Sequence, residues 1–238
     1  MQFFHFSPEY KEIRVLQEQP GRRLVLLENQ KRKQKLLWRC SNRGNGDVYE
    51  SLCGIDHPNL RPVYDVCSEG NTVEVLEEYL EGKTLSAVLQ ERTLKKTEVK
   101  QVMIGLCQAL EALHGLSIVH RDIKPENVMI GEKGQVWLID YDAARVMDGK
   151  EQETRVLGTP GYAAPEQYGV TACENTADIF AMGVLLNMML CGEHPARKMC
   201  HGWAGHIVRK CTRMEPKKRY RSAARLQKAC RLLPGATA

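Results

Sequence analysis

The chain contains the stretch His120-Arg121-Asp122-Ile123-Lys124-Pro125-Glu126-Asn127, which combines several functional groups in one short segment. An Asp carboxylate can accept a proton from a hydroxyl group, and a Lys two residues later can neutralise developing negative charge. An Asn amide oxygen, five residues after the Asp, is a suitable ligand for a hard metal ion. These groups at these offsets indicate the chemistry of phosphoryl transfer.

The stretch resembles the catalytic loop of protein kinases, and later segments extend the resemblance. Asp140-Tyr141-Asp142 follows a predicted strand, where the family carries Asp-Phe-Gly. Gly158 to Glu166 resembles the end of the kinase activation segment and ends in an intact Ala164-Pro165-Glu166. The resemblance implies an α+β, two-lobed protein kinase-like fold. Residues 1–81 would form a small antiparallel β-sheet N-lobe with one helix, and residues 82–238 a larger, mainly helical C-lobe.

The resemblance also assigns roles in the C-lobe. Asp122 would be the catalytic base and Lys124 would stabilise the charge of the transferred γ-phosphate. Asn127 and Asp140 would hold Mg²⁺ bound to ATP. A Lys at position 124 goes with serine/threonine kinases, and Thr159 stands where the family uses a Thr to hydrogen-bond the catalytic Asp and Lys.

Further positions in the C-lobe match structural and regulatory features of the family. Glu166 is expected to pair with Arg219, and Asp178 to accept hydrogen bonds from the backbone of the catalytic loop. Arg121 before Asp122 is typical of kinases that are switched on by phosphorylation in the activation segment. Thr154 is the candidate acceptor, and an unmodified loop Thr is the equally weighted alternative.

Length and composition favour one kinase domain. The chain has 238 residues and is 43% hydrophobic, which suits one large globular unit or two small lobes. It has no apolar run of about 18 residues and no secretion signal at its start, so we expect a cytoplasmic protein without a membrane segment in this chain. The nine cysteines form no CxxC pair and are expected to be reduced packing residues.

The net charge of +5 arises mainly from residues 31–35 and 209–231. Each cluster could meet an acidic partner, but solvated surface is the favoured interpretation, because no aromatic residues interleave with the cations. We therefore expect a protein substrate and no nucleic-acid partner.

Periodicity separates a strand-rich first part from a helical second part. Strands are expected at 12–16, 24–28, 35–40, 60–67 and 72–77, with a helix near 47–55. An amphipathic helix is expected over 99–113 and a buried apolar helix over 177–190. Short strands at 118–119, 128–130 and 136–139 bracket the catalytic loop.

The nucleotide-binding half departs from the family pattern. A Gly-rich phosphate loop should join the first two strands, but residues 16–24 contain only Gly21. Arg22 or Arg23 could compensate by charge, although a surface turn is the favoured interpretation of two arginines beside Pro-Gly.

Arg39 stands where the third strand of the family carries a Lys. Its planar fork can grip phosphate oxygens, but its reach differs from that of Lys. Strand alternation puts Leu37 on the same face, where it would contact adenine, and Lys35 is the fallback cation.

The helix carboxylate that should pair with this cation is also displaced. Val48 occupies the expected position, and Asp47 and Glu50 are the neighbouring acids. Either acid could pair with Arg39 if the helix were short or rotated.

Glu78-Tyr79-Leu80-Glu81-Gly82 resembles the adenine-binding hinge of the family. The resemblance makes the carbonyl of Glu78 and the amide of Leu80 the contacts to the base. Leu24, Leu37 and Met129 would enclose the adenine ring.

The sequence thus predicts an ATP- and Mg²⁺-dependent protein serine/threonine kinase of bacterial-like type. The alternative is a pseudokinase that binds partners with little or no phosphotransfer, favoured by the missing glycines, Arg39, Val48 and Asp142. A small-molecule phosphotransferase is disfavoured by Ala164-Pro165-Glu166, which in the family shapes a peptide-docking platform.

Overall fold

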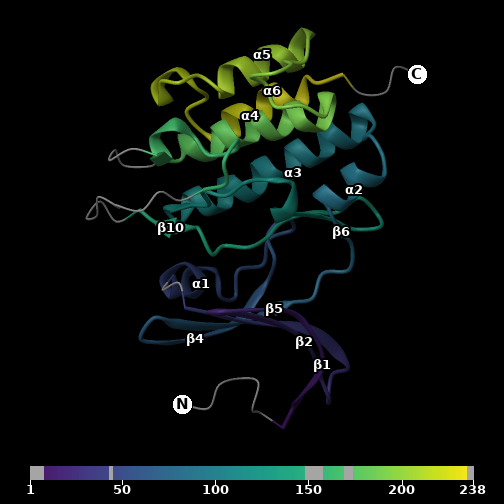
Figure 1. The fold of residues 1–238 in the computed structure, drawn as a ribbon, viewed down its shortest axis with the longest axis vertical. Coiled ribbons are helices and arrows are strands. Elements are labelled where there is room, and N and C mark those ends of the chain that lie inside the picture. The colour runs from purple at the N-terminus through teal and green to yellow at the C-terminus, as the bar shows by residue number, and fades with distance from the viewer. Residues whose placement is uncertain (1–7, 43–44, 148–157, 169–173, 235–238) are drawn as a thin grey trace. The chain divides into compact units, whose positions relative to one another are not determined.

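The computed structural model describes residues 8–42, 45–147, 158–168 and 174–234. The chain divides into two compact units, Met1–Glu81 and Gly82–Ala238, which we call the N-terminal and C-terminal units (Figure 1). The N-terminal unit is an antiparallel sheet with one helix, and the C-terminal unit is mainly helical. The predicted α+β architecture is therefore confirmed.

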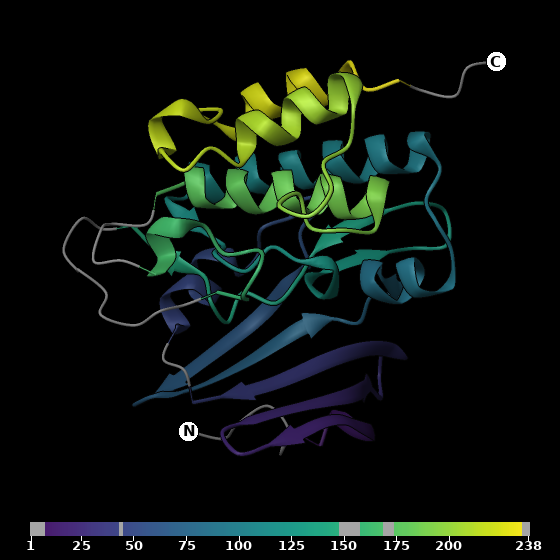
Figure 2. The ribbon, with the colours of Figure 1, turned by 45° about the horizontal axis from the view of Figure 1, so that its top comes forward.

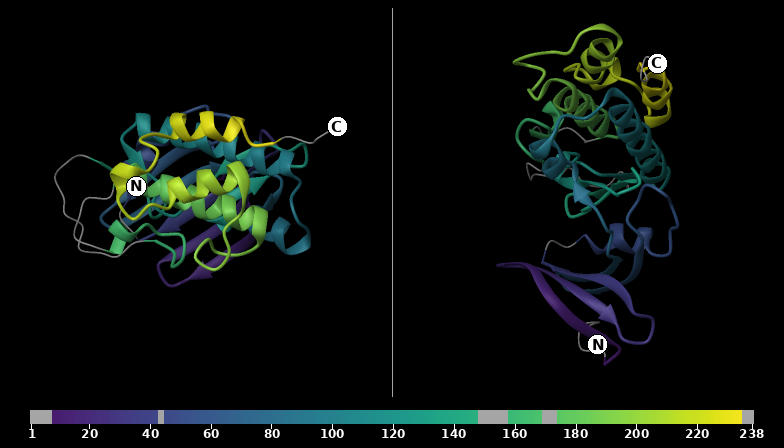
Figure 3. Two further views of the ribbon diagram at one scale, coloured as in Figure 1. Left: turned by 90° about the horizontal axis from the view of Figure 1, so that it is seen from above. Right: turned by 90° about the vertical axis from the view of Figure 1, so that its right-hand side faces the viewer.

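The sheet of the N-terminal unit has the strand order β1-β2-β3-β5-β4, and every neighbouring pair is antiparallel. The right-hand view of Figure 3 shows its twist. The strands are β1 (Tyr10–Gln19), β2 (Arg22–Asn29), β3 (Gln34–Ser41), β4 (Val63–Glu69) and β5 (Thr72–Glu78), and the helix is α1 (Gly46–Leu52). All five predicted strands are present, but β4 begins after Pro62, later than predicted, because Pro lacks the N–H that a ladder needs.

The two faces of this sheet differ in character. Side chains that alternate along β2, β3 and β5 pack into a core cluster of Val25, Leu27, Leu36, Trp38 and Leu76. The register puts Leu24 opposite Arg39 and Leu37 opposite Glu77, so these four residues belong to the other face. Two charged residues therefore lie on a sheet face at positions where strand burial would normally favour apolar side chains.

The C-terminal unit is built on two long helices, α3 (Lys96–Gly115) and α4 (Thr176–Cys191), which pack against each other (Figure 2). Helix α6 (Ala223–Arg231) packs on α3, and α5 (Gly202–Cys211) packs on α4 and lies beside α6 in the left-hand view of Figure 3. Glu98 caps the start of α3 by accepting from the backbone N–H of Lys95 at 2.7 Å. Both helices predicted for this region are confirmed. Within the described residues, no helix has both the length and the apolar character needed to cross a membrane.

Short elements shape the loops at one side of α3 and α4. They are α2 (Leu85–Glu91), β6 (Lys83–Thr84), β7 (Ile118–Val119), β8 (Val128–Ile130), β9 (Val136–Leu138) and β10 (Arg145–Val146). Strands β6, β8 and β9 form one small sheet, and β7 pairs with β10. The segment from residue 120 to residue 127 is thus anchored at both ends, by β7 before it and β8 after it.

Candidate active site

The loop between β7 and β8 brings Asp122, Lys124 and Thr159 into direct contact. Lys124 Nζ lies 2.8 Å from Asp122 Oδ2 and donates to Thr159 Oγ1 at 2.8 Å. Thr159 Oγ1 in turn donates to Asp122 Oδ1 at 2.6 Å. Burial raises the pKa of Asp122, but the hydrogen bonds from Lys124 and Thr159 outweigh it, so the net pKa lies below its usual value. The carboxylate is therefore ionised at neutral pH and can accept a hydrogen bond from a hydroxyl group.

Asn127 and Asp140 lie on adjacent segments. The amide nitrogen of Asn127 donates to Asp122 O at 2.8 Å and to Asp122 Oδ2 at 2.9 Å, which leaves the amide oxygen as a ligand atom. The backbone N–H of Ile139 donates to the Asn127 carbonyl at 2.9 Å, and Asp140 is the next residue. Amide and carboxylate oxygens suit Mg²⁺, which commonly takes one or two protein ligands together with substrate phosphates.

Two residues beside these groups have a left-handed backbone. Arg121 has φ 65° and Asp140 has φ 66°, a region that residues other than Gly adopt at a cost. Arg121 is held in this conformation because its carbonyl accepts from Gln167 Nε2 at 2.9 Å and its N–H donates to Asp178 Oδ1 at 2.8 Å. Backbone strain of this kind is concentrated at functional sites, which supports the assignment of this loop.

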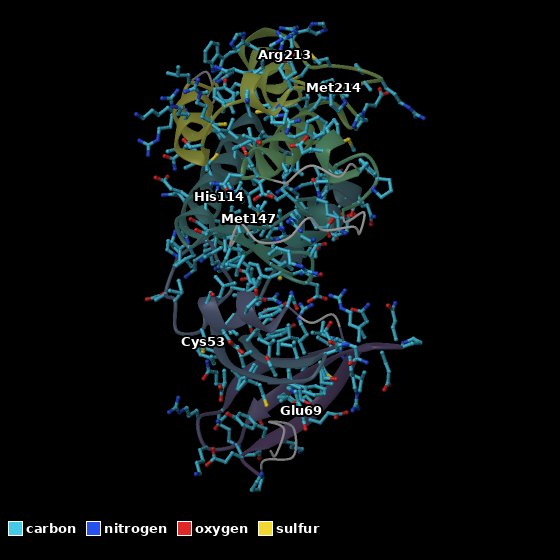
Figure 4. All side chains as sticks on the ribbon, turned by 90° about the vertical axis from the view of Figure 1, so that its left-hand side faces the viewer. Cys53, Glu69, His114, Met147, Arg213 and Met214 are labelled. Atoms are coloured by element: carbon cyan, nitrogen blue, oxygen red, sulfur yellow. The ribbon has the colours of Figure 1, made fainter. Side chains whose placement is uncertain are left out.

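Asp178, near the start of α4, accepts hydrogen bonds from the backbone of the catalytic loop. Its carboxylate is fully buried and accepts from the backbone N–H of His120 at 3.0 Å, from that of Arg121 and from His114 Nε2 at 2.8 Å. His114 and Met147 are labelled in Figure 4, and the sulfur of Met147 accepts from Arg121 Nη2 at 3.8 Å. The expected contact between Asp178 and the loop backbone is present.

Replacing Asp178 with Asn should destabilise the protein by about 2 kcal/mol at neutral pH, because an amide cannot accept all three hydrogen bonds. Burial raises the pKa of Asp178, but the hydrogen bond and charge of His114, together with His120, have the larger effect, so the net pKa lies below the usual 3.8. A carboxylate with a depressed folded pKa stabilises the fold above its unfolded pKa, and this contribution is lost as the pH falls through the folded value. Urea unfolding of wild type and variant should therefore give a difference that shrinks below about pH 4. A difference that stays constant down to pH 2 would contradict this role for the carboxylate.

Glu166 and Arg219 form a buried, two-pronged ion pair. Arg219 Nη1 lies 2.6 Å from Glu166 Oε1, and Nη2 lies 2.9 Å from Oε2. The guanidinium also donates to the carbonyls of Thr176, Arg213 and Met214, of which the last two residues are labelled in Figure 4. The expected pair is present, and it ties the end of the segment at residue 166 to the loop before α6.

Tyr141 and Asp142 replace the Phe and Gly of the family pattern without visible strain. Tyr141 is fully buried, lies edge-on to His120 and donates its hydroxyl to the Leu138 carbonyl at 3.1 Å. Asp142 is not among the described residues with positive φ, so this conformation does not need the backbone freedom of Gly. Asp142 is buried, with 5% of its surface exposed, and it adds a second carboxylate two residues after Asp140.

The N-terminal unit has a tight hairpin in place of a phosphate-binding loop. Gln19 pairs with Arg22 across a two-residue turn of Pro20 and Gly21, and Gly21 has φ 75°. The Gly21 carbonyl accepts from the backbone N–H of Asn42 at 3.0 Å. A turn this short cannot wrap its backbone around phosphate groups. The possibility that the charge of Arg23 compensates for the missing glycines is wrong. Arg23 pairs with Glu12 and Glu18 and lies over the Trp38 ring, on the sheet face opposite to Arg39.

Arg39 is buried and forms its ion pair within the sheet. Its side chain is 3% exposed, and Nε lies 3.4 Å from Glu77 Oε2 on β5. The predicted helix partners are wrong: Glu50 is exposed and accepts from Ser68 Oγ at 3.2 Å, and Asp47 is exposed at the first turn of α1. The helix is short, which was one of the two conditions given for such a pair, but Val48 lies on its buried side and both acids lie on its exposed side.

The other predicted residues of the N-terminal unit lie on β2, β3 and the end of β5. Leu37 is buried beside Arg39 on the same face, and the register pairs Leu24 with Arg39. Glu78 ends β5 and Leu80 is buried just after it. The fallback cation Lys35 is exposed, and its Nζ lies 3.4 Å from Glu81 Oε1 in a surface ion pair.

Met129 belongs to the C-terminal unit, on β8, where it is 9% exposed. Thr154 lies outside the described residues. The sequence reasoning missed Glu77 and its second partner Arg61, whose Nη1 lies 3.5 Å from Glu77 Oε2. The available signal was an acid directly after Val75 and Leu76 in a strand-forming stretch, because a buried acid normally needs a cation.

Comparison with known proteins agrees with this geometry. The family model described as "Protein kinase domain" matches residues 47–232, and the chain belongs to this family. Similar proteins include the probable serine/threonine-protein kinase PknB of Bifidobacterium longum, with 34% identity over 159 residues, covering 61% of this chain and 23% of that protein. The serine/threonine-protein kinase PknD of Chlamydia trachomatis is 32% identical over 179 residues, covering 60% and 19%. The chain thus spans about a fifth to a quarter of the length of these relatives. The two units correspond to the two lobes of a protein kinase fold.

Proposed function

We propose that this chain is a protein serine/threonine kinase that transfers the γ-phosphate of Mg²⁺-bound ATP to a protein hydroxyl group. The observation that carries the proposal is the triangle of Asp122, Lys124 and Thr159, with contacts of 2.6 to 2.8 Å. This arrangement combines an ionised base and a cation in one loop, which lies between strands β7 and β8. The names of the bacterial relatives support the same activity and the serine/threonine class.

In the proposed mechanism, Asp122 orients the substrate hydroxyl and accepts its proton as the phosphoryl group is transferred. Lys124 stabilises charge on the γ-phosphoryl oxygens, and its bond to Thr159 fixes the position of its ammonium group. Asn127 and Asp140 would hold Mg²⁺. The metal supplies charge neutralisation for the β- and γ-phosphates when it is bound.

On the nucleotide side, Arg39 is proposed to bind phosphate oxygens. Leu24, Leu37 and Met129 would contact the adenine ring, and the backbone of Glu78 and Leu80 would bind its edge. With only a two-residue turn between β1 and β2, Arg39 would carry more of the phosphate contact than the corresponding cation does beneath a Gly-rich loop. A weak affinity for nucleotide is therefore expected.

Incubation with Mg²⁺-ATP should add phosphoryl groups to the protein itself or to a generic protein rich in Ser and Thr. Intact-mass measurement detects this addition directly. Chelation of Mg²⁺ by EDTA should abolish the mass increase, because charge on the triphosphate would lose its counterion.

The control for this experiment is the same incubation with ADP, which cannot donate a γ-phosphate. Binding of nucleotide without any mass increase would favour the pseudokinase alternative, to which the tight Gln19–Arg22 turn lends support. No binding and no mass increase would contradict the proposed kinase activity and leave a pseudokinase that binds only protein partners.

We further propose a cytoplasmic location. Among the described residues, free thiols include Cys40, Cys53 and Cys191 and the buried Cys107, Cys200, Cys211 and Cys230. Free thiols in this number are typical of a reducing compartment.

A further inference from the structure

We propose that Glu77 positions Arg39 for nucleotide binding, in place of a carboxylate on helix α1. This inference rests on the proposed function, because it takes Arg39 as the cation that meets the phosphates. Glu77 on β5 is then the positioning residue, and no carboxylate of helix α1 is needed for this role. Arg39, Glu77 and their neighbours described below all lie in the N-terminal unit.

The register of the sheet brings the two charges together. Arg39 pairs with Val75 and Leu37 pairs with Glu77, so Arg39 and Glu77 are diagonal neighbours on one face. Nε of Arg39 lies 3.4 Å from Oε2 of Glu77, and the two side chains are 3% and 0% exposed. The backbone ladder fixes the Cα positions of the two residues, so their side chains start from neighbouring places on the same sheet face.

Arg61 adds a second cation to the same carboxylate oxygen. Its Nη1 lies 3.5 Å from Glu77 Oε2, and its side chain is 6% exposed. Arg61 lies in the segment between α1 and β4, next to Pro62, whose carbonyl accepts from the backbone N–H of Glu78 at 3.0 Å. The carboxylate of Glu77 is therefore in contact with two guanidinium groups, and both attractions favour the same buried position for it.

Helix α1 offers no carboxylate that could do the same work. Its buried residues are Gly46, Val48, Tyr49 and Leu52, while Asp47 and Glu50 face solvent. Glu50 is committed to Ser68. A displacement of α1 would therefore leave the pair of Arg39 and Glu77 intact, and the cation would stay in place whatever the position of the helix.

Glu74 provides a matched control for Glu77. It lies on the same strand, three residues earlier, on the opposite face of the sheet. It is also buried, at 5% exposure, and accepts from Trp38 Nε1 at 3.1 Å. Loss of either carboxylate should destabilise the sheet, but only loss of Glu77 should affect Arg39.

The test is calorimetric titration of a non-hydrolysable ATP analogue with Mg²⁺ into wild type, Glu77→Gln and Glu74→Gln. Glu77→Gln should weaken binding at least about tenfold, the value of one charge-assisted hydrogen bond, and Glu74→Gln should not. The fitted stoichiometry reports the folded fraction, so a loss of fold is separated from a loss of affinity. Equal affinity of Glu77→Gln and wild type would overturn the inference.

Two further variants keep the test decisive if Glu77→Gln does not fold. In an Arg39→Met background, Glu77→Gln should change the affinity no further, because Glu77 acts through Arg39. The exposed double variant Asp47→Asn/Glu50→Gln should bind like wild type, and a tenfold loss there would assign the task to the helix. Failure of the wild type to bind the analogue would contradict the proposed function itself.

Discussion

Replacement of Asp122 by Asn is expected to lower kcat for phosphotransfer by about a thousandfold, within the range that a positioned general base contributes. The amide keeps the shape of the side chain but cannot take a proton from the substrate hydroxyl. It also removes the charge that orients Lys124, whose Nζ lies 2.8 Å from Asp122 Oδ2. Initial rates with saturating Mg²⁺-ATP and a Ser/Thr protein substrate would measure the effect.

Glu126 supplies the control for this variant. It is an exposed acid of the same loop, and its carboxylate accepts only from Ser86 Oγ at 3.0 Å among the described contacts. Glu126→Gln should keep kcat within about twofold, because surface substitutions away from special features have small effects. If Asp122→Asn and Glu126→Gln gave the same rate as wild type, the assignment of the catalytic base would be wrong.

The lowered pKa of Asp122 implies that this residue should not cause pH dependence of the wild-type rate near neutral pH. Burial raises this pKa, and the bonds from Lys124 and Thr159 lower it to below its usual 3.8. The base is therefore already ionised throughout the pH range of an assay near neutrality. Any acid limb of the rate profile between about pH 5 and 7 must come from another group, such as a histidine or the nucleotide phosphates.

The sequence predicted the arrangement of the C-terminal unit well, because its contacts follow from motifs. Asp122, Lys124 and Asn127 interact over two to five positions, so their spacing defines their geometry. The contacts of the distant residues Asp178 and Arg219 were also predicted, because the resemblance to the kinase family assigns a partner to each of them. A buried charge leaves few alternatives.

The N-terminal unit was predicted less well, because its functional contacts depend on sheet register. Arg39 and Glu77 are 38 positions apart and meet only because β3 and β5 are neighbours with one defined register. Strand alternation alone gave the face of Arg39 but not its partner. The family pattern predicts the partner of Arg39 on α1, but the buried side of this helix is occupied by Val48 and Tyr49. Burial of the helix thus decided the orientation of its acids.

Replacement of Arg219 by Met should destabilise the C-terminal unit by about 3 to 5 kcal/mol, since it leaves the carboxylate of Glu166 buried and unpaired. The side chains are 0% and 8% exposed, so water cannot compensate. The variant also removes the donor for the carbonyls of Thr176 and Met214, and the contact with the Phe180 ring at 5.0 Å. Urea unfolding followed by circular dichroism would measure the loss.

Two comparisons separate the buried pair from charge in general. Lys218→Met removes an exposed ion pair with Glu215 in the same loop and should cost less than about 1 kcal/mol, because solvent screens surface pairs. The double variant Arg219→Met/Glu166→Leu should recover part of the stability lost by Arg219→Met, because no unpaired charge remains buried. A double variant as unstable as the sum of the single variants would mean that the carbonyl contacts, and not the ion pair, account for the stability at this position. Recovery would instead show that the pair is retained for its geometry: the two-pronged bond fixes the segment at Glu166, whose neighbour Gln167 holds the backbone of the catalytic loop at Arg121.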